Sequence, residues 1–260
     1  YLNSKKFIKL NKNDVVLDIG ANDGTLIKFY KKQYKTIGCE PAKNLISDLK
    51  KNCHHIINDF WSKKKLDILL KKHRLNKPKI ITAIGMFYDL ENPMKFIGDI
   101  SDSLDDEGIF IAQLMCLNSM IKKNDLGNIC HEHIEFYSHK SLKYLFEKNN
   151  LEIFKIEENE INGGSYRIYC RKLNKGSIKL KNEEVVESLK RFYSRINLNK
   201  KRTINFFKKC QKKGKKIFLY GASTKGNTLL QYYNIDSTLV PYAAERSKTK
   251  YGKYTVGTGI

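Results

Sequence analysis

The sequence predicts an α/β protein with a Rossmann-like sheet, followed by a helical connector and the start of a second, truncated Rossmann-like domain. Strand-like and helix-like runs alternate from Val15 to Met115, and a glycine turn follows the first strand-like run. A second strand, glycine turn and helix begin near Gly214, after a long polar stretch with helical character. The expected parts are a first domain at 1–175, the connector at 176–213 and the second domain at 214–260.

The first five strand-like runs are separated by helix-like runs. Such alternation is typical of parallel strands joined by helices. The expected strands are 15–20, 35–40, 55–58, 79–85 and 109–115, and the expected helices between them are 25–32, 42–52, 61–73 and 93–104.

The second half of the first domain changes pattern. After an amphipathic helix at 138–149, "LEIFKIEEN" and "GGSYRIYCRK" follow each other as strand-like runs, which favours an antiparallel pair at the sheet edge. A long polar helix is expected at 183–213, then a strand at 216–221 and a helix at 226–233.

Composition and charge limit the class of protein. None of the 260 residues forms part of an apolar run of membrane-spanning length, the N-terminus lacks a signal-peptide core, and the six cysteines are scattered without a CxxC pair. These features predict a cytoplasmic protein with free thiols and no membrane partner. The net charge of +22 comes mostly from lysines in short helical runs, which favours a solvated basic surface that attracts anionic substrates.

Both ends of the chain look incomplete. Tyr1 is not a start methionine, and "KYTVGTGI" stops in what looks like a connection. We therefore expect the chain to be a fragment.

The first glycine turn predicts the cofactor. Its G-x-x-x-G spacing differs from the G-x-G-x-x-G of dinucleotide sites, and the acids in and before it would repel a pyrophosphate. Glu40 ends the second strand, where a carboxylate can hold both ribose hydroxyls. A cation with a free ribose diol and no phosphate fits, and S-adenosylmethionine (SAM) has these properties. The predicted contacts are Asp18, Gly20, Ala21, Asn22, Asp23, Gly24, Glu40 and Pro41.

Further cofactor contacts are expected after the third and fourth strands. Asp59 could accept from the adenine amino group and Phe60 could cover its face, although an ordinary strand end explains them almost as well. Met86 and Tyr88 follow the fourth strand, with Tyr88 expected on the methyl-transfer side or, equally, as a packed aromatic ring.

Ionisable groups are concentrated in "CHEHIEFY". A carboxylate between two imidazoles can orient one of them as a general base near neutral pH. His131, Glu132, His133 and Tyr137 are therefore the candidate catalytic residues. No metal is expected, because Cys130 with the two histidines would be an awkward ligand set on one short segment. Satisfying loop backbone groups is the remaining explanation for the histidines.

Four segments together resemble the nucleotide-sugar C-methyltransferases, in the same order along nearly the whole chain. They are "LDIGANDGTL", "NICHEHIEFYS", "INGGSYRIY" and "YGASTKGNTLLQYY…AERSKTKYGKYTVGTGI". The resemblance implies a class I methyltransferase domain that binds SAM and a C-terminal Rossmann-like domain that helps to hold a nucleotide sugar. The family's N-terminal zinc-binding module has no counterpart here, and Cys130 replaces a tyrosine of the sugar-modifying members.

The resemblance also implies a reaction, SAM-dependent methylation of a carbon beside a ketone in a keto-deoxysugar nucleotide. Together with residue type it makes His133 the base; Glu132 would orient it or polarise a sugar hydroxyl, and His131 and Tyr137 are candidate donors to the enolate.

The second glycine turn is expected to bind the sugar-nucleotide diphosphate, or to be a vestige of such a site. Backbone donors at a helix N-terminus attract phosphate. The residues concerned are Gly221, Ser223, Thr224, Lys225 and Gly226. NAD is not expected, because no acid follows at the required place.

Two other functions compete with C-methylation. The same fold could methylate oxygen or nitrogen of another small metabolite, and the basic charge could indicate an RNA-binding or RNA-methylating protein. Nucleic acid is not the expected partner, because no RNP-type aromatic motif or catalytic Asn/Asp-Pro-Pro-aromatic segment is present.

Overall fold

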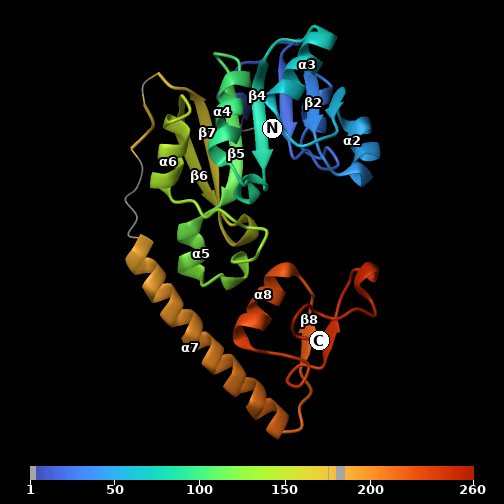
Figure 1. Ribbon diagram of the computed structural model, residues 1–260, viewed down its shortest axis with the longest axis vertical. Helices are drawn as coiled ribbons and strands as arrows, with labels where there is room; N and C mark the ends of the chain where they lie inside the picture. Colours follow the sequence, from blue (N-terminus) through green and yellow to red (C-terminus); the bar gives the residue numbers. More distant parts are fainter. Residues whose placement is uncertain (1–3, 175, 180–184) are drawn as a thin grey trace. The chain divides into compact units, whose positions relative to one another are not determined.

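The computed structural model describes residues 4–174, 176–179 and 185–260, and the chain divides into two compact units (Figure 1). The first is built from Tyr1–Cys116 and Glu135–Glu183, and the second from Leu117–Ile134 and Glu184–Ile260. The segment Leu117–Ile134 therefore leaves the first unit after its fifth strand and packs with the C-terminal part of the chain.

The first unit contains a seven-stranded sheet in the order β3-β2-β1-β4-β5-β7-β6. The first five strands are parallel, and β7 is antiparallel to both β5 and β6. The strands are β1 (Val15–Ile19), β2 (Lys35–Cys39), β3 (His55–Ile57), β4 (Pro78–Ile84), β5 (Ile109–Met115), β6 (Leu151–Asn159) and β7 (Ser165–Lys172). The strand order reverses between β1 and β4, so a crevice is expected at their carboxyl ends.

Five α-helices of the first unit lie among the described residues. They are α1 (Lys28–Lys31), α2 (Ile46–Asn52), α3 (Lys63–His73), α4 (Pro93–Ser103) and α6 (His139–Glu147). Side-chain caps start the longer ones: Ser62 accepts from the Lys65 N–H, and Asn92 from the Lys95 N–H, with Pro93 at the first helical position. Ser138 forms a capping box with Ser141.

Each face of the sheet has its own apolar core. Alternate residues of one strand point to opposite faces, so Leu17 joins the core under α3, α4 and α6, whereas Val16 joins the core with α1 and α2. Figure 1 shows α4 and α6 lying over the sheet on the first of these faces. The result is a three-layer arrangement with the carboxyl ends of β1, β2 and β4 at one edge.

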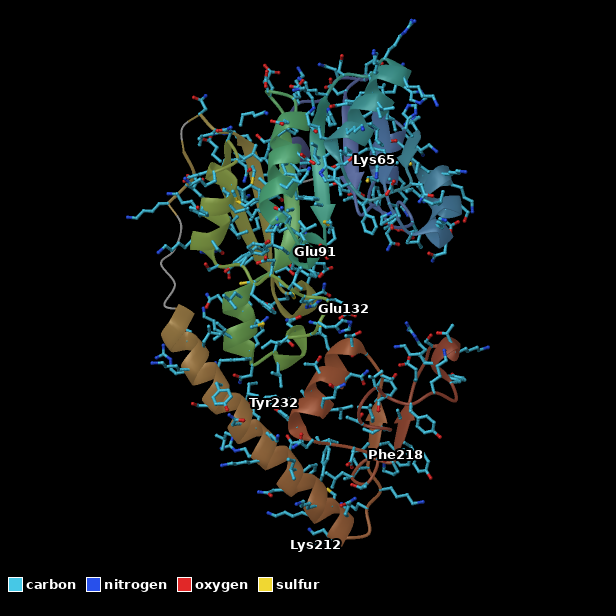
Figure 2. The ribbon with its side chains drawn as sticks, viewed as in Figure 1. Lys65, Glu91, Glu132, Lys212, Phe218 and Tyr232 are labelled. Atoms are coloured by element: carbon cyan, nitrogen blue, oxygen red, sulfur yellow. The ribbon has the colours of Figure 1, made fainter. Side chains whose placement is uncertain are left out.

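The second unit has two parallel strands, β8 (Phe218–Tyr220) and β9 (Tyr242–Ala244). The 28-residue helix α7 (Val185–Lys212) precedes them; on it Asn197 accepts from the Tyr232 hydroxyl at 3.1 Å (Figure 2). The other elements are α5 (Leu117–Lys123), the 3₁₀ turn η4 (Leu126–Asn128), α8 (Thr224–Tyr233) and the 3₁₀ turn η6 (Lys248–Lys250).

The predicted α/β sheet and its antiparallel edge pair are confirmed, with differences in detail. The helix expected at 25–32 is regular only over α1, because Gly24 has a positive φ of 84° and the Thr25 N–H donates to the Asp23 side chain, which forms a turn. The sequence did not predict α5. The start of the helix expected at 183 lies outside the described residues.

No helix within the described part of the chain is long and apolar enough to cross a membrane.

Candidate active site

The first glycine turn follows β1 and is hydrogen-bonded to the last residue of β2. The N–H groups of Gly20 and Ala21 both donate to the Cys39 carbonyl, at 2.9 and 3.1 Å. Gly20 has a φ of +69°, and a Cβ there would lie 3.1 Å from the Met86 Cγ. Glycine therefore allows both the left-handed turn and the close approach of Met86.

Glu40 ties this turn to the end of β2. Its carboxylate is buried and accepts from the Asn22 N–H at 2.9 Å and the Ala42 N–H at 2.8 Å. Its own backbone carbonyl accepts from the Asn58 side chain after β3. The structure thus brings the predicted residues Asn22, Glu40 and Pro41 together at one edge of the sheet. Ionised carboxylate oxygens have further acceptor capacity, which a ribose diol could use.

Asp59 and Phe60 follow β3 with different degrees of engagement. The Asp59 carboxylate forms an ion pair with Lys65 at 2.6 Å and accepts from the Phe60 N–H, and Lys65 lowers its pKa (Figure 2). The Phe60 ring is 74% exposed. The Asp59 carboxylate is thus already paired with Lys65, whereas the Phe60 ring is open to solvent and could stack on a ligand. The contacts of both residues with adenine stay a prediction.

Asp18 and Asp23 titrate in opposite directions. Burial raises the pKa of the Asp18 carboxyl to about 7, helped by the negative charge of Glu40 and opposed by the Thr82 hydroxyl, which donates to it at 2.5 Å. The pKa of Asp23, which is partly exposed, is lowered by its hydrogen bonds with Thr25. A cation bound beside Asp18 would therefore shift this carboxyl to its ionised form near neutral pH.

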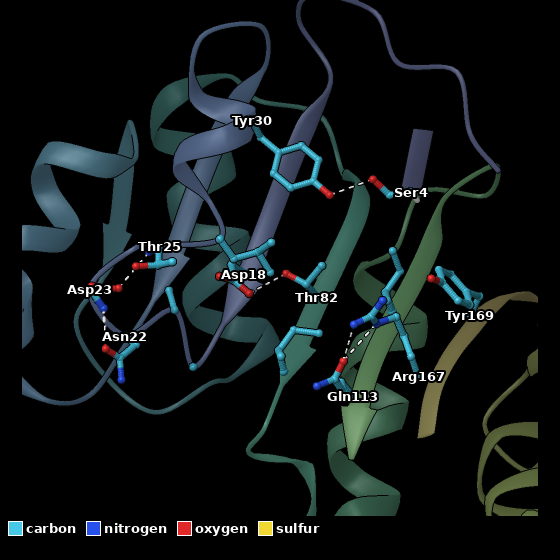
Figure 3. Close-up of a pocket in the computed structure, with 15 residues that line it drawn as sticks. Ser4, Asp18, Asn22, Asp23, Thr25, Tyr30, Thr82, Gln113, Arg167 and Tyr169 are labelled. Carbon is cyan, nitrogen blue, oxygen red and sulfur yellow. Dashed lines mark hydrogen bonds between the residues drawn. The ribbon is translucent and has the colours of Figure 1, made fainter. Parts of the chain in front are cut away.

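A hollow of about 770 Å³ opens beside Asp18, within the size range of small-molecule sites (Figure 3). The glycine turn forms one side of it. The other side contains residues that the sequence analysis missed, namely Ser4, Tyr30, Thr82, Gln113, Arg167 and Tyr169. One signal was present: Gln113 interrupts the apolar run "IFIAQLM" of a fully buried strand.

Tyr88 and Tyr137 are both buried in the first unit. The Tyr88 carbonyl accepts from the Glu135 N–H, and the ring of Tyr137 lies 5.2 Å from that of Phe87. The Tyr137 hydroxyl has no hydrogen-bond partner among the described residues, and burial, with the charge of Glu135, raises its pKa. A buried hydroxyl in this state costs free energy unless a ligand or water bonds it.

The His-Glu-His segment belongs to the second unit. The Nδ1 atom of His133 lies 2.9 Å from the Asn128 carbonyl oxygen, which can only accept, so in the neutral imidazole Nδ1 carries the proton and Nε2 carries the lone pair. The Asn128 side chain in turn donates to Asp125 at 2.7 Å.

His131 and Glu132 are held more loosely. His131 is 87% exposed, and its Nδ1 lies 3.6 Å from a Glu132 oxygen (Figure 2). A hydrogen bond with the Cys130 thiol lowers the pKa of Glu132. Within the described residues, no group of three His, Cys, Asp or Glu side chains is arranged to hold a metal ion.

The second glycine turn repeats part of the geometry of the first. The Gly221 N–H donates to the Ala244 carbonyl, and Glu245 accepts from the N–H groups of Ala222 and Ser247 at 2.8 and 2.9 Å. These backbone donors lower the pKa of Glu245 to about 2. The expectation that no acid follows this turn at the end of a strand is wrong, because Glu245 comes directly after β9.

Two residues of the predicted diphosphate site, Ser223 and Lys225, already have partners within the protein. Ser223 caps α8 by accepting from the Gly226 N–H, and Lys225 forms an ion pair with Asp125 at 3.5 Å. Gly221 has a φ of +84°, and no atom lies within 4 Å of a Cβ built there. Phosphate binding at Gly221, Ser223, Thr224, Lys225 and Gly226 stays a prediction.

Comparison with known families decides the class. Residues 3–156 match the family described as "Methyltransferase domain", and residues 160–260 match the "C-methyltransferase C-terminal domain". The chain belongs to the class I methyltransferases. SAM is the cofactor of this family, and the predictions of family, fold and cofactor are confirmed.

Individual relatives are distant. The chain is 21% identical to the C-methyltransferase NovU of Streptomyces niveus over 97% of its length, and spans 63% of the length of that protein. SAM-dependent methyltransferases from Clostridium acetobutylicum and Methanosarcina mazei are similar in structure, with TM-scores of 0.50 and identities of 11% and 15%. Each similarity extends over 66% of this chain. It extends over 87% of the Clostridium protein and 98% of the Methanosarcina protein. These similarities show the fold.

The site chemistry of this methyltransferase fits SAM. The groups around the first glycine turn are the carboxylates of Asp18, Asp23 and Glu40, which suit an ammonium, a sulfonium and a ribose diol and would repel a pyrophosphate. The fit therefore rests on the charge of the lining as well as on the family.

Proposed function

We propose that this protein is a SAM-dependent C-methyltransferase that acts on a keto-deoxysugar nucleotide. The supporting observation is the combination on one chain of a methyltransferase domain with a C-methyltransferase C-terminal domain. The similarity to NovU, a C-methyltransferase, favours methylation of carbon over methylation of oxygen or nitrogen.

The first unit holds the cofactor in this proposal. Glu40 binds the ribose hydroxyls, Asp18 and the 20–24 turn hold the amino-acid end, and Phe60 covers the adenine. Met86 and Tyr88 lie beside the methyl group. Glu40 is suited to its role because two backbone donors fix its carboxylate, so little side-chain freedom is lost when a diol binds.

His133 is the general base. The Asn128 carbonyl holds its Nδ1 proton, so Nε2 can take the proton from the carbon beside the substrate ketone. The C–H electron pair moves into the enolate, and the carbon then forms its new bond to a methyl group. When bound, SAM supplies that methyl group as an electrophile on its sulfonium, and leaves as S-adenosylhomocysteine (SAH).

The neighbouring residues support this proton transfer. Glu132 orients the imidazole or polarises a sugar hydroxyl. His131 and Tyr137 donate to the enolate oxygen; Tyr137 is suited to this because its buried hydroxyl lacks a partner among the described residues. Lys225 and the turn around Gly221 hold the nucleotide phosphates.

Exchange of the substrate's α-deuterium tests the base separately from methyl transfer. With a keto-deoxysugar nucleotide deuterated beside the ketone, the protein should release deuterium to water and, with SAM, form a carbon-methylated product. In His133→Ala both should fall by roughly 10²- to 10⁴-fold, the usual contribution of a positioned base, while SAH affinity stays nearly unchanged.

His131→Ala is the comparison variant, because it removes an exposed imidazole two residues away that supplies one of two donors to the enolate and not the base. It should reduce both rates much less. Persistent deuterium release in His133→Ala would transfer the role of base to Glu132 or Tyr137. Methyl transfer only to oxygen or nitrogen would replace the proposed reaction.

A further inference from the structure

Arg167 lies on β7, in a part of the hollow that the glycine turn does not reach. The chain has 49 lysines and arginines, yet among the described residues that line this hollow Arg167 is the one with a basic side chain. Figure 3 shows Asp18 and Arg167 on two walls of the same hollow. The site thus offers one negative and one positive group to a single ligand.

Gln113 fixes the orientation of Arg167. The strands β5 and β7 place the two residues directly opposite each other, and the Gln113 Oε1 atom accepts from Nε at 3.0 Å and from Nη2 at 2.7 Å. Gln113 is buried and uncharged. It therefore holds the guanidinium plane without neutralising its charge, and N–H donors beyond these two remain for another acceptor.

Glu157 compensates the charge of Arg167 only in part. Glu157 Oε2 lies 3.9 Å from Nη1 of Arg167, too far for a hydrogen bond. Glu157 is engaged more closely elsewhere, by Lys155 at 2.9 Å and by the Tyr169 hydroxyl at 2.9 Å. An anion entering the hollow would therefore meet a preoriented cation.

The acids of the other wall restrict what that anion can be. A phosphate would be repelled by Asp23, whose pKa is lowered, whereas an α-amino acid carries an ammonium and a carboxylate a few ångströms apart. Burial raises the pKa of Asp18 to about 7, so this carboxyl is only partly ionised at neutral pH without a ligand, and a nearby ammonium would favour its ionised form. A zwitterion thus matches both walls.

We propose that Arg167, held by Gln113, binds the carboxylate of the methionine part of SAM while Asp18 binds its ammonium. This inference rests on the cofactor assigned to the family and adds a contact outside the glycine turn. Guanidinium and carboxylate groups form charge-assisted hydrogen bonds, so the contact contributes both affinity and selection for the intact amino acid.

Calorimetric titration with SAM and with decarboxylated SAM tests the proposal, because the second ligand keeps the ammonium and lacks the carboxylate. Arg167→Met should weaken binding of SAM by roughly 10- to 100-fold and leave binding of decarboxylated SAM almost unchanged. Asp18→Asn should weaken both ligands. Equal effects of Arg167→Met on the two ligands, or no effect on either, would overturn the proposal.

Two further variants separate binding from folding. Gln113→Glu keeps the shape of the side chain but places a negative charge against Arg167, so it should also weaken SAM selectively. Lys172→Met removes a positive charge from the same strand outside the hollow; its Nζ donates to the Ser101 carbonyl. Lys172→Met should leave both affinities unchanged. Failure of the unsubstituted protein to bind SAM at all would instead overturn the cofactor assignment and this inference with it.

Discussion

Asp18 makes the stability of the protein depend on pH. Its pKa is about 7 in the folded chain, against 3.8 for an ordinary Asp. Between these values the folded state holds a proton that the unfolded state has released, so raising the pH favours unfolding. From this carboxyl alone, the free energy of unfolding should fall by up to ~4 kcal/mol between about pH 4 and pH 7. Chemical denaturation across this pH range measures it.

Asp18→Asn isolates the contribution of this carboxyl. The variant cannot ionise, so its free energy of unfolding relative to the unsubstituted protein should rise steadily from pH 4 to pH 7 and then level off. Asp48→Asn, an exposed residue paired with Lys51, should show no such trend. A constant difference between Asp18→Asn and the unsubstituted protein would contradict the burial argument.

At the residue scale, the sequence indicates which groups lie together where they stand at fixed places after strands, and their contacts with the cofactor stay a prediction. Gly20 and Glu40 stand at fixed places after strands, and the structure brings that turn and that carboxylate together. Arg167 and Gln113 could not be found in this way, because they are 54 positions apart and only the register of β5 against β7 makes them neighbours. Tertiary pairing of this kind leaves no local signal.

At the scale of elements, η4 and α8 approach each other too closely for any side chain at Gly127. A Cβ there would lie 2.8 Å from the Lys225 Cβ and 2.9 Å from its carbonyl oxygen, and backbone cannot move aside as a flexible side chain can. Gly127→Ala should therefore force the two elements apart and lower the free energy of unfolding by ~1–3 kcal/mol, the usual cost of overpacking. Thermal and urea unfolding measure this loss.

Gly98→Ala is the matched control for the substitution. Gly98 lies inside α4, where a Cβ would meet only the end of the Asn149 side chain, at 3.2 Å. Alanine also has a higher helix propensity than glycine, by about 1 kcal/mol. Gly98→Ala should thus be neutral or slightly stabilising. A similar loss in both variants would mean that the packing of η4 on α8 is unimportant.

Helices and strands were predictable where the hydrophobic period and the residues that bound the element indicate the same limits. The 109–115 run was predicted to the residue, because it is apolar apart from Gln113 and follows a glycine-containing turn. The helix at 25–32 was predicted too long, because hydrophobic spacing cannot show that Asp23 and Gly24 form a turn. The short helix α5 was missed because its seven residues span fewer than two periods of a helical pattern.

At the scale of the whole molecule, the two units differ in how deeply their sheets are buried. Residues of β1 and β5 are all buried, whereas β8 and β9 have exposed residues at both ends. Backbone amides open more readily where few apolar contacts cover them. The amides of 214–260 should therefore exchange hydrogen faster than those of 15–115, and mass spectrometry of peptides can measure the difference.

Cofactor binding should widen the difference in hydrogen-exchange rate between the two units, because the glycine turn, Glu40 and Arg167 all belong to the first unit. A ligand that binds only the folded state at 100 times its Kd adds about 2.7 kcal/mol to the free energy of opening, which slows exchange ~100-fold. With SAH, amides of β1, β2 and β4 that exchange through opening of the first unit should slow by this factor, and those of β8 and β9 should not. In Glu40→Ala, at the same SAH concentration, the slowing should shrink sharply. Equal slowing of both units would show instead that the second unit contributes to the cofactor site.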